Sequence, residues 1–168
     1  MLSLYRVLTF LIYPIFIILI YLRSFLKKED STRYKEKIFS SSFDFNRNKK
    51  KKLIWFHAAS IGETLSIFPL IEKISNFNKN IDFLITTVTL SSAELLKKRL
   101  VKYNNITHRF FPLDIQNLTG KFLDGWKPNL ICFVDSEIWP NILFQIKNKK
   151  IPLALINGRI TKKTLRRW

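Results

Sequence analysis

The stretch HAASIGE, residues 57–63, joins small residues and a glycine to a carboxylate directly after the apolar run 53–56. A carboxylate that is ionised at neutral pH accepts the proton of a hydroxyl within hydrogen-bond reach. Glu63 is therefore a candidate general base. A second interpretation is open, because Ser60 and Glu63 also fit the S-x-x-E capping box, in which the carboxylate only closes a helix N-terminus.

Gly62 bears on the choice between these interpretations. In the first turn of a helix a glycine costs about 1 kcal/mol relative to alanine, and its missing side chain lets a ligand approach the backbone closely. Ala58 and Ala59 keep the preceding residues small as well. The composition of the loop thus allows a ligand to bind there. His57 is expected to be a polar partner within the loop rather than a catalyst.

Five short apolar runs alternate with amphipathic stretches from residue 51 onward, which predicts parallel strands with covering helices. The runs are 53–56, 81–86, 107–111, 130–134 and 152–157. This order predicts an α/β fold, a Rossmann-like doubly wound parallel sheet, in which ligands bind outside the carboxyl ends of the strands. The segments that follow the strands should therefore meet at one edge; they are HAASIGE, TVTLSS, PLDIQN, DSEIWPN and NGRIT.

Helices are expected between these strands, at 63–76, 91–102, 118–125 and 141–147. One face of the first helix carries the apolar residues Leu65, Phe68, Ile71 and Ile74. That face should pack on the sheet. In the second helix, Ser91 and Glu94 form another S-x-x-E pair, which predicts that the helix starts there.

The N-terminus carries sixteen uncharged residues, 7–22, between two arginines. As a helix they would reach about 24 Å, slightly less than a bilayer core. The basic residues that follow them, Arg23, Lys27 and Lys28, outweigh Arg6 and the amino terminus before them, which predicts that the rest of the chain is cytoplasmic. Pro14 permits a helix that lies in the interface as well as one that spans. A core helix of a soluble domain is the remaining alternative.

The formal net charge of +17 indicates a partner with phosphates, although a bias toward Lys and Asn explains part of it. The lysines that end the polar segment 29–52 can rest on anionic lipid or belong to a solvated loop. The sequence has no zinc spacing, Walker loop or aromatic-rich basic motif, so nucleic acid is not expected. The single cysteine, Cys132, lies in an apolar run and is expected in the core.

Together these motifs resemble the 3-deoxy-D-manno-octulosonic acid (Kdo) transferases of lipopolysaccharide synthesis. The resemblance covers nearly the whole chain: a hydrophobic N-terminus, a basic connector, and the segments IWFHAASIGET, ITTVTLSSAE, FFPLD, FLDGWKPNLICFVDSEIWPN and IPLALINGRIT. It implies the acceptor-facing N-terminal domain of a two-domain GT-B glycosyltransferase, at the cytoplasmic face of the inner membrane.

For the chemistry, the resemblance implies transfer of Kdo from CMP-Kdo to a hydroxyl of the lipid A precursor (lipid IVA), inverting at the anomeric carbon, with no cofactor and no metal. Glu63 matches the family's general base. Asp135 falls where the family has a glutamate assigned to transition-state stabilisation, and it is one methylene shorter. The acceptor-binding positions that the resemblance implies are Ser60, Gly62, Glu137, Asn141 and Arg159.

Some of these positions have a structural alternative, and one segment departs from the family. Pro140 can open a helix, with Trp139 and Asn141 serving only its packing. Residues 90–92, Leu-Ser-Ser, replace a Pro-Thr-Gly pattern. Arg159 and the basic residues after it could meet acceptor phosphates near the edge of the crevice.

The expected domains are a membrane anchor over 1–26, a basic membrane-proximal connector over 27–52 and the acceptor-binding α/β domain over 53–168. The family's C-terminal donor domain, which holds CMP, is absent from this sequence. We therefore expect a part of a longer enzyme, inactive alone, or a second chain that supplies the donor half. The alternative from another class is a membrane-tethered protein that binds anionic lipid or nucleic acid without chemistry.

Overall fold

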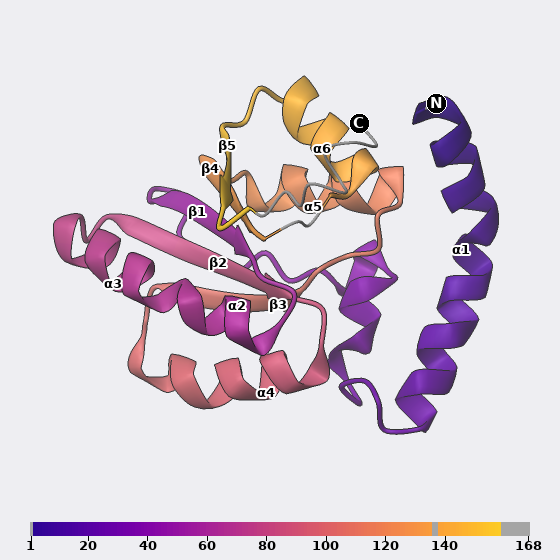
Figure 1. Cartoon of the computed structure of the whole chain (residues 1–168), viewed down its shortest axis with the longest axis horizontal. Coiled ribbons are helices and arrows are strands. Elements are labelled where there is room, and N and C mark those ends of the chain that lie inside the picture. Colours follow the sequence, from indigo (N-terminus) through magenta and orange to yellow (C-terminus); the bar gives the residue numbers. More distant parts are fainter. Residues whose placement is uncertain (1, 136–137, 159–168) are drawn as a thin grey trace.

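The computed structural model describes residues 2–135 and 138–158 and contains a parallel five-stranded sheet covered by helices (Figure 1). The strands are β1 (Lys52–His57), β2 (Ile81–Thr87), β3 (Ile106–Phe110), β4 (Leu130–Val134) and β5 (Leu153–Ile156). Their order is β3-β2-β1-β4-β5, and every neighbouring pair is parallel. The prediction of a doubly wound α/β sheet is confirmed, with each predicted strand found at its place.

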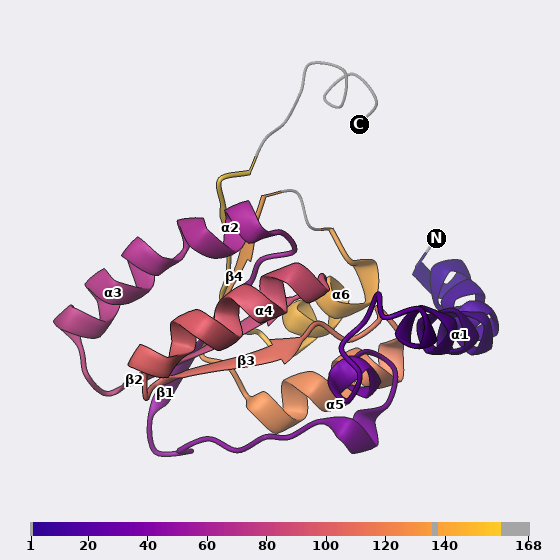
Figure 2. The same cartoon turned by 90° about the horizontal axis from the view of Figure 1, so that it is seen from below.

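Helices cover both faces of this sheet (Figure 2). They are α1 (Leu2–Phe25), α2 (Ile61–Ser66), α3 (Phe68–Phe77), α4 (Leu90–Arg99), α5 (Gln116–Trp126) and α6 (Pro140–Asn148), with short 3₁₀ helices at Arg33–Lys37, Ser40–Ser42 and Leu100–Lys102. Side chains alternate along β1, so Ile54 and Phe56 pack with α3 and α4, whereas Leu53 and Trp55 pack with α5 and α6. Burial on both faces explains why the strands read as continuous apolar runs.

The first expected helix, 63–76, is in fact two helices that meet at Ile67. Pro69 lies in the first turn of α3, where its missing N–H leaves no hydrogen bond unmade. The prediction that Leu65 packs on the sheet is wrong, because Leu65 belongs to the separate α2 and is exposed. Phe68 and Ile71, both in α3, are fully buried as predicted.

The start predicted for the second helix is also wrong. The N-cap of α4 is Thr89, whose hydroxyl accepts a hydrogen bond from the backbone N–H of Ser92. Thr89 has extended backbone angles, as an N-cap residue requires. Ser91 is already inside the helix, so it cannot cap it with Glu94.

The segment predicted as a connector folds along the outer edge of the sheet. Glu36 accepts a hydrogen bond from the backbone N–H of Phe110 in β3 at 2.9 Å, and Arg33 donates to the carbonyl of His108 at 3.0 Å. Arg33 and Glu36 also form an ion pair. These contacts occupy backbone groups of an edge strand that would otherwise be open to another chain.

The first helix, α1, runs beside the domain in both views (Figures 1 and 2). Its length and composition would allow it to cross a membrane. Tyr5, Thr9 and Tyr13 succeed one another at helical spacing and share one face. Tyr5 and Thr9 have polar contacts with the α/β domain, and Tyr13 donates to the backbone carbonyl of Ile38 in the segment 27–52. Most of the other large apolar side chains of α1 are exposed.

Candidate active site

The order of the strands reverses between β1 and β4. From β1 the chain moves outward through β2 and β3, and then returns to the other side of β1 with β4 and β5. Ligands of open parallel sheets bind at such a reversal, outside the carboxyl ends of the strands. The segment 57–63 follows β1 and the segment beginning at Asp135 follows β4. The two stretches that carry the proposed catalytic carboxylates therefore flank the reversal point.

Glu63 lies in the first turn of α2 and is partly buried. Its Oε2 accepts a hydrogen bond from the backbone N–H of Ala59 at 2.8 Å, and its Oε1 accepts one from the hydroxyl of Ser60 at 2.6 Å. The backbone N–H of Glu63 donates back to Ser60 Oγ at 3.3 Å. The N-cap predicted at Ser60 is confirmed, whereas the Glu63 carboxylate reaches back to the N–H of Ala59 rather than to that of Ser60, as a standard capping box would require.

Capping leaves the carboxylate of Glu63 able to act on a ligand. An ionised carboxylate can accept about four hydrogen bonds, and those from Ala59 and Ser60 use one on each oxygen. The two interpretations of Glu63 are thus compatible, because the contacts that cap the helix also fix the direction of the carboxylate.

Two further predicted site residues lie beside it. Ser60 is exposed and is the N-cap of α2. Gly62 is also exposed, and a Cβ atom added to it would meet nothing within 4 Å. Its φ lies outside the left-handed region. Neither backbone conformation nor packing within the described part of the chain therefore requires a glycine at this position.

Asp135 directly follows β4 in a left-handed backbone conformation, with φ of 61°. Its N–H donates to the carbonyl of Ile156 at 2.8 Å, which ties the loop to the end of β5. Aspartate adopts this conformation more readily than longer side chains do. The left-handed backbone at this position thus gives a physical reason for aspartate rather than the longer glutamate. Glu137 and Arg159, also predicted as site residues, lie outside the described residues.

Asn141, predicted to contact an acceptor, is fully buried in this structure. Its Nδ2 donates to the backbone carbonyl of Asp114 at 2.5 Å. Trp139 is the N-cap of α6 and packs its ring on Phe111, with the ring centres 5.9 Å apart. This geometry matches the structural alternative, since a buried Asn141 has no surface for an acceptor.

Asp114 was not identified from the sequence, although it holds α6 in place. Its carboxylate accepts hydrogen bonds from the backbone N–H groups of Asn141 and Ile142, each at 2.9 Å, and from the hydroxyl of Tyr5 at 2.9 Å. Burial raises the pKa of Asp114, while these hydrogen bonds oppose the rise. The sequence did contain one sign that a distant residue caps α6. The helix opens on Trp139 and Pro140, and neither is a residue type that caps helices.

His57 and Cys132 lie close to the site but are buried in the core. His57 is fully buried at the end of β1, with Nδ1 3.0 Å from the hydroxyl of Thr86 and its ring stacked on Phe111. Cys132 is buried, and this burial raises the pKa of its thiol to about 11. Within residues 2–135 and 138–158, no group of three His, Cys, Asp or Glu side chains is placed to hold a metal ion.

The chain is similar to known proteins over its whole length. Residues 32–168 match the family model described as 3-deoxy-D-manno-octulosonic-acid transferase (kdotransferase). The whole chain is 37% identical to 3-deoxy-D-manno-octulosonic acid transferase of Rickettsia bellii and 32% identical to that of Rickettsia prowazekii. A bifunctional glycosyltransferase/methyltransferase of Fusobacterium nucleatum is 27% identical over 87% of the chain.

The chain spans only part of these relatives. It covers 39% of the Rickettsia bellii protein, 44% of the Rickettsia prowazekii protein and 22% of the Fusobacterium nucleatum protein. The matched portion contains both loops that follow β1 and β4.

Proposed function

Because the chain belongs to the 3-deoxy-D-manno-octulosonic acid transferase family, we propose that it forms the acceptor-side half of an enzyme that transfers Kdo. The donor is CMP-Kdo, and the acceptor is a hydroxyl of the lipid A precursor. The observation that carries the proposal is the placement of Glu63, whose partly buried carboxylate is fixed by two hydrogen bonds beside the reversal point of the sheet.

In this proposal Glu63 is the general base. Its carboxylate takes the proton of the acceptor hydroxyl as the hydroxyl oxygen attacks the anomeric carbon of Kdo. The bond from that carbon to the CMP phosphate breaks, and CMP leaves with the electron pair. Attack from the side opposite the leaving group inverts the anomeric carbon. Asp135, after the neighbouring strand, stabilises the positive charge that develops on the sugar ring.

The remaining residues bind or position the acceptor. The exposed Ser60 and Gly62 offer a surface without bulky side chains beside the base. Glu137 and Arg159 are proposed to contact the acceptor, on the basis of the family resemblance. Asn141 is proposed to act indirectly, through the start of α6. Catalysis in this scheme uses no metal and no cofactor.

We place the reaction at the cytoplasmic face of the inner membrane, with α1 as the membrane-associated element. The length and apolar surface of α1 support this location. The basic residues in the last turn of the helix and just after it, Arg23, Lys27 and Lys28, also support it. The nucleotide of CMP-Kdo is expected to bind to the donor half, which corresponds to the part of the relatives' length that this chain does not cover.

The decisive experiment is Kdo transfer by the intact enzyme carrying Glu63→Gln. The amide keeps the size of the side chain and cannot take the proton, so turnover should fall by about 100-fold or more. Thermal unfolding checks that the fold is kept. Glu94→Gln, an exposed change on α4, is the matched control and should leave turnover unchanged.

Two results would contradict the assignment. Wild-type turnover in Glu63→Gln would remove Glu63 as the base. Binding of the lipid A precursor with no transfer by the wild-type intact protein, in the presence of CMP-Kdo, would favour a membrane-tethered binding protein.

A further inference from the structure

Glu29 and Lys37 form a buried ion pair in the segment predicted as a connector. Only 6% of each residue is exposed. The other oxygen of the Glu29 carboxylate accepts a hydrogen bond of 2.8 Å from Nε of Arg23, in the last turn of α1. Two buried charges need a reason at these positions, because taking a charge out of water is costly even when the charge is paired.

The ammonium of Lys37 also holds a loop at the carboxyl edge of the sheet. Its Nζ donates a hydrogen bond of 2.8 Å to the backbone carbonyl of Val88. Val88 lies between the last residue of β2, Thr87, and the N-cap of α4, Thr89. Lys37 therefore joins the segment that precedes the sheet to the loop that leaves β2.

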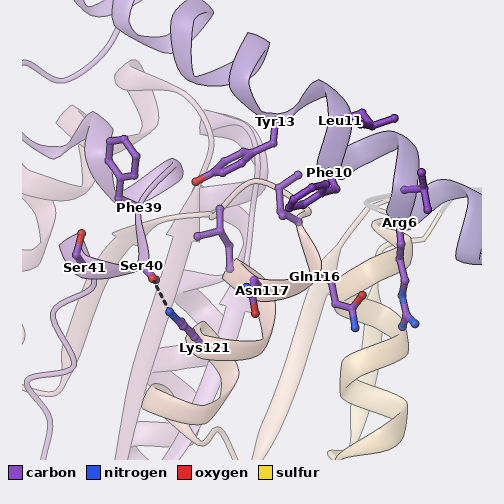
Figure 3. A pocket seen from close by; sticks show the side chains of 13 residues that line it. Arg6, Phe10, Leu11, Tyr13, Phe39, Ser40, Ser41, Gln116, Asn117 and Lys121 are labelled. Carbon is purple, nitrogen blue, oxygen red and sulfur yellow. Dashed lines mark hydrogen bonds between the residues drawn. The ribbon is translucent and has the colours of Figure 1, made fainter.

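The backbone around Lys37 is held on two sides. Its carbonyl accepts a hydrogen bond of 2.8 Å from the N–H of Leu113, and the next carbonyl, that of Ile38, accepts one from the hydroxyl of Tyr13. Figure 3 shows Tyr13 reaching from α1 toward the segment that carries Phe39. The side chain of Lys37 thus starts from a fixed backbone, as a residue that positions another group requires.

The loop held by Lys37 lies beside the loop that carries Glu63. The two loops follow β1 and β2, which are neighbours in the sheet. Directly after β1, the N–H of Ala58 donates to the carbonyl of Thr86 at 3.0 Å, and the helices that follow the two loops, α2 and α4, are in contact. Val88 is exposed. The loop after β2 thus offers surface at the edge where parallel sheets bind their ligands.

Other roles explain the buried pair less well. A pocket of about 580 Å³ lies between α1 and the start of α5 (Figure 3), but neither Glu29 nor Lys37 lines it. Burial lowers the pKa of Lys37, and Glu29 opposes this shift. Apolar side chains can replace a buried ion pair without loss of stability. An apolar side chain cannot donate to the carbonyl of Val88, so this hydrogen bond is what specifically requires the lysine.

We propose that Lys37 is a positioning residue for acceptor binding, an inference that rests on the proposed function. Glu29 directs the ammonium at the carbonyl of Val88. Lys37 in turn keeps the loop after β2 in the arrangement in which it contacts the acceptor beside Glu63. The acceptor site therefore depends on the segment 27–52 as well as on the sheet and its helices.

Hydrogen exchange of the full chain in neutral detergent tests whether Lys37 holds the loop. The double variant Glu29→Met with Lys37→Met removes both buried charges, so its thermal midpoint should stay within about 5 °C of wild type. Amides of residues 87–92 should exchange at least about fivefold faster, because the loop has lost its donor. Lys97→Met, an exposed change on α4, is the control and should exchange like wild type.

Kinetics of the intact enzyme separate positioning from stability. In the double variant KM for the lipid A precursor should rise about tenfold, the loss expected for one hydrogen bond from a charged group. The kcat should stay within about twofold of wild type, because Glu63 is unchanged. Glu29→Gln alone should be less stable than the double variant, since it leaves the ammonium without its carboxylate. Its KM should nevertheless rise less, because Lys37 still donates to Val88.

A purely structural pair would give the opposite order, with KM following thermal stability, and that order would overturn the proposal. Unchanged exchange of residues 87–92 in the double variant would overturn it too, as would an unchanged KM. Absence of Kdo transfer by the wild-type intact enzyme would contradict the proposed function instead. The exchange measurement needs no turnover, so it would still show whether Lys37 holds the loop after β2.

Discussion

The hydroxyl of Tyr5 donates a hydrogen bond of 2.9 Å to Oδ2 of Asp114, although the two residues are 109 positions apart in the sequence. The same carboxylate caps α6 through Asn141 and Ile142. One side chain thus joins the first turn of α1 to the helix that follows the loop beginning at Asp135. The placement of α1 and that of the start of α6 are therefore coupled.

Asp114→Ala should lower the free energy of unfolding by about 2–3 kcal/mol, because it leaves two buried N–H groups of α6 without their acceptor. Tyr5→Phe should cost only about 1 kcal/mol, since it removes a single hydrogen bond. Urea unfolding in neutral detergent measures both. Asp124→Ala, at an exposed carboxylate, is the control and should cost less than 1 kcal/mol. Equal losses for Asp114→Ala and Asp124→Ala would show that the capping contacts contribute little.

Gly62→Ala should separate stability from activity. Alanine fits the open space at this position and should stabilise α2 by about 0.5–1 kcal/mol. If the acceptor approaches the backbone here, the added methyl group should lower the rate of Kdo transfer by the intact enzyme. Thermal unfolding and turnover are measured on the same variant. A stabilised variant with full turnover would show that the acceptor does not approach Gly62.

Asp135 allows the charge and the backbone to be tested separately. Asp135→Asn keeps a residue that tolerates the left-handed conformation, so stability should change by less than about 0.5 kcal/mol. Asp135→Ala should cost about 1 kcal/mol through backbone strain. Both should reduce turnover of the intact enzyme, because both remove the negative charge. Normal turnover in Asp135→Asn would contradict the role of this charge in the transition state.

His108 should make the fold sensitive to acid. Burial, followed by the charges of Arg33 and Arg109, lowers its pKa to about 3, with a smaller opposing effect of Asp30. The guanidinium of Arg33 lies 3.2 Å from Nδ1 of His108, so Nδ1 must accept. Nε2 then donates to the hydroxyl of Thr87, 3.0 Å away. A proton on Nδ1 would break the hydrogen bond from Arg33, and the positively charged imidazolium would repel the guanidinium of Arg33.

The sign of this pH effect follows from the lowered pKa. Below an ordinary histidine pKa of about 6.5 the unfolded chain binds a proton that the folded chain does not. The free energy of unfolding should therefore fall as the pH drops from about 6.5 toward 3, by up to about 1.4 kcal/mol per pH unit. Asp114 acts in the opposite direction, since burial raises its pKa. His108→Gln should flatten the acid slope, and an unchanged slope would contradict this role.

The sequence was informative wherever the relevant contact is local or periodic. Unbroken apolar runs predicted the strands, and the parallel order then predicted that the loops after β1 and β4 share an edge. The contacts between Ser60 and Glu63 were predictable because the two residues are only three positions apart. The break at Ile67 could have been predicted from Pro69, but the apolar spacing on either side of it matched one continuous helix.

Contacts between distant segments were not predictable in this way. Asp114 caps a helix that begins 26 residues later, and no periodicity links the two positions. Glu36 bonds to Phe110 from a segment whose polar composition is typical of a solvated connector. The buried state of Asn141 likewise depends on where Asp114 lies, so its residue type alone indicated a ligand contact as readily as a structural one.

The polar stripe of Tyr5, Thr9 and Tyr13 would limit how deeply the proposed membrane-associated helix α1 enters a bilayer. A lone helix crossing the bilayer would leave these hydroxyls in hydrocarbon without the domain partners they have here. With that stripe held by the rest of the protein, lipid would reach α1 only from its other sides. The carboxyl edge of the sheet would then stay at a constant height above the membrane surface. A lipid-borne acceptor would be met there by lateral diffusion, and the rate would depend on its surface density in the leaflet rather than on its bulk concentration.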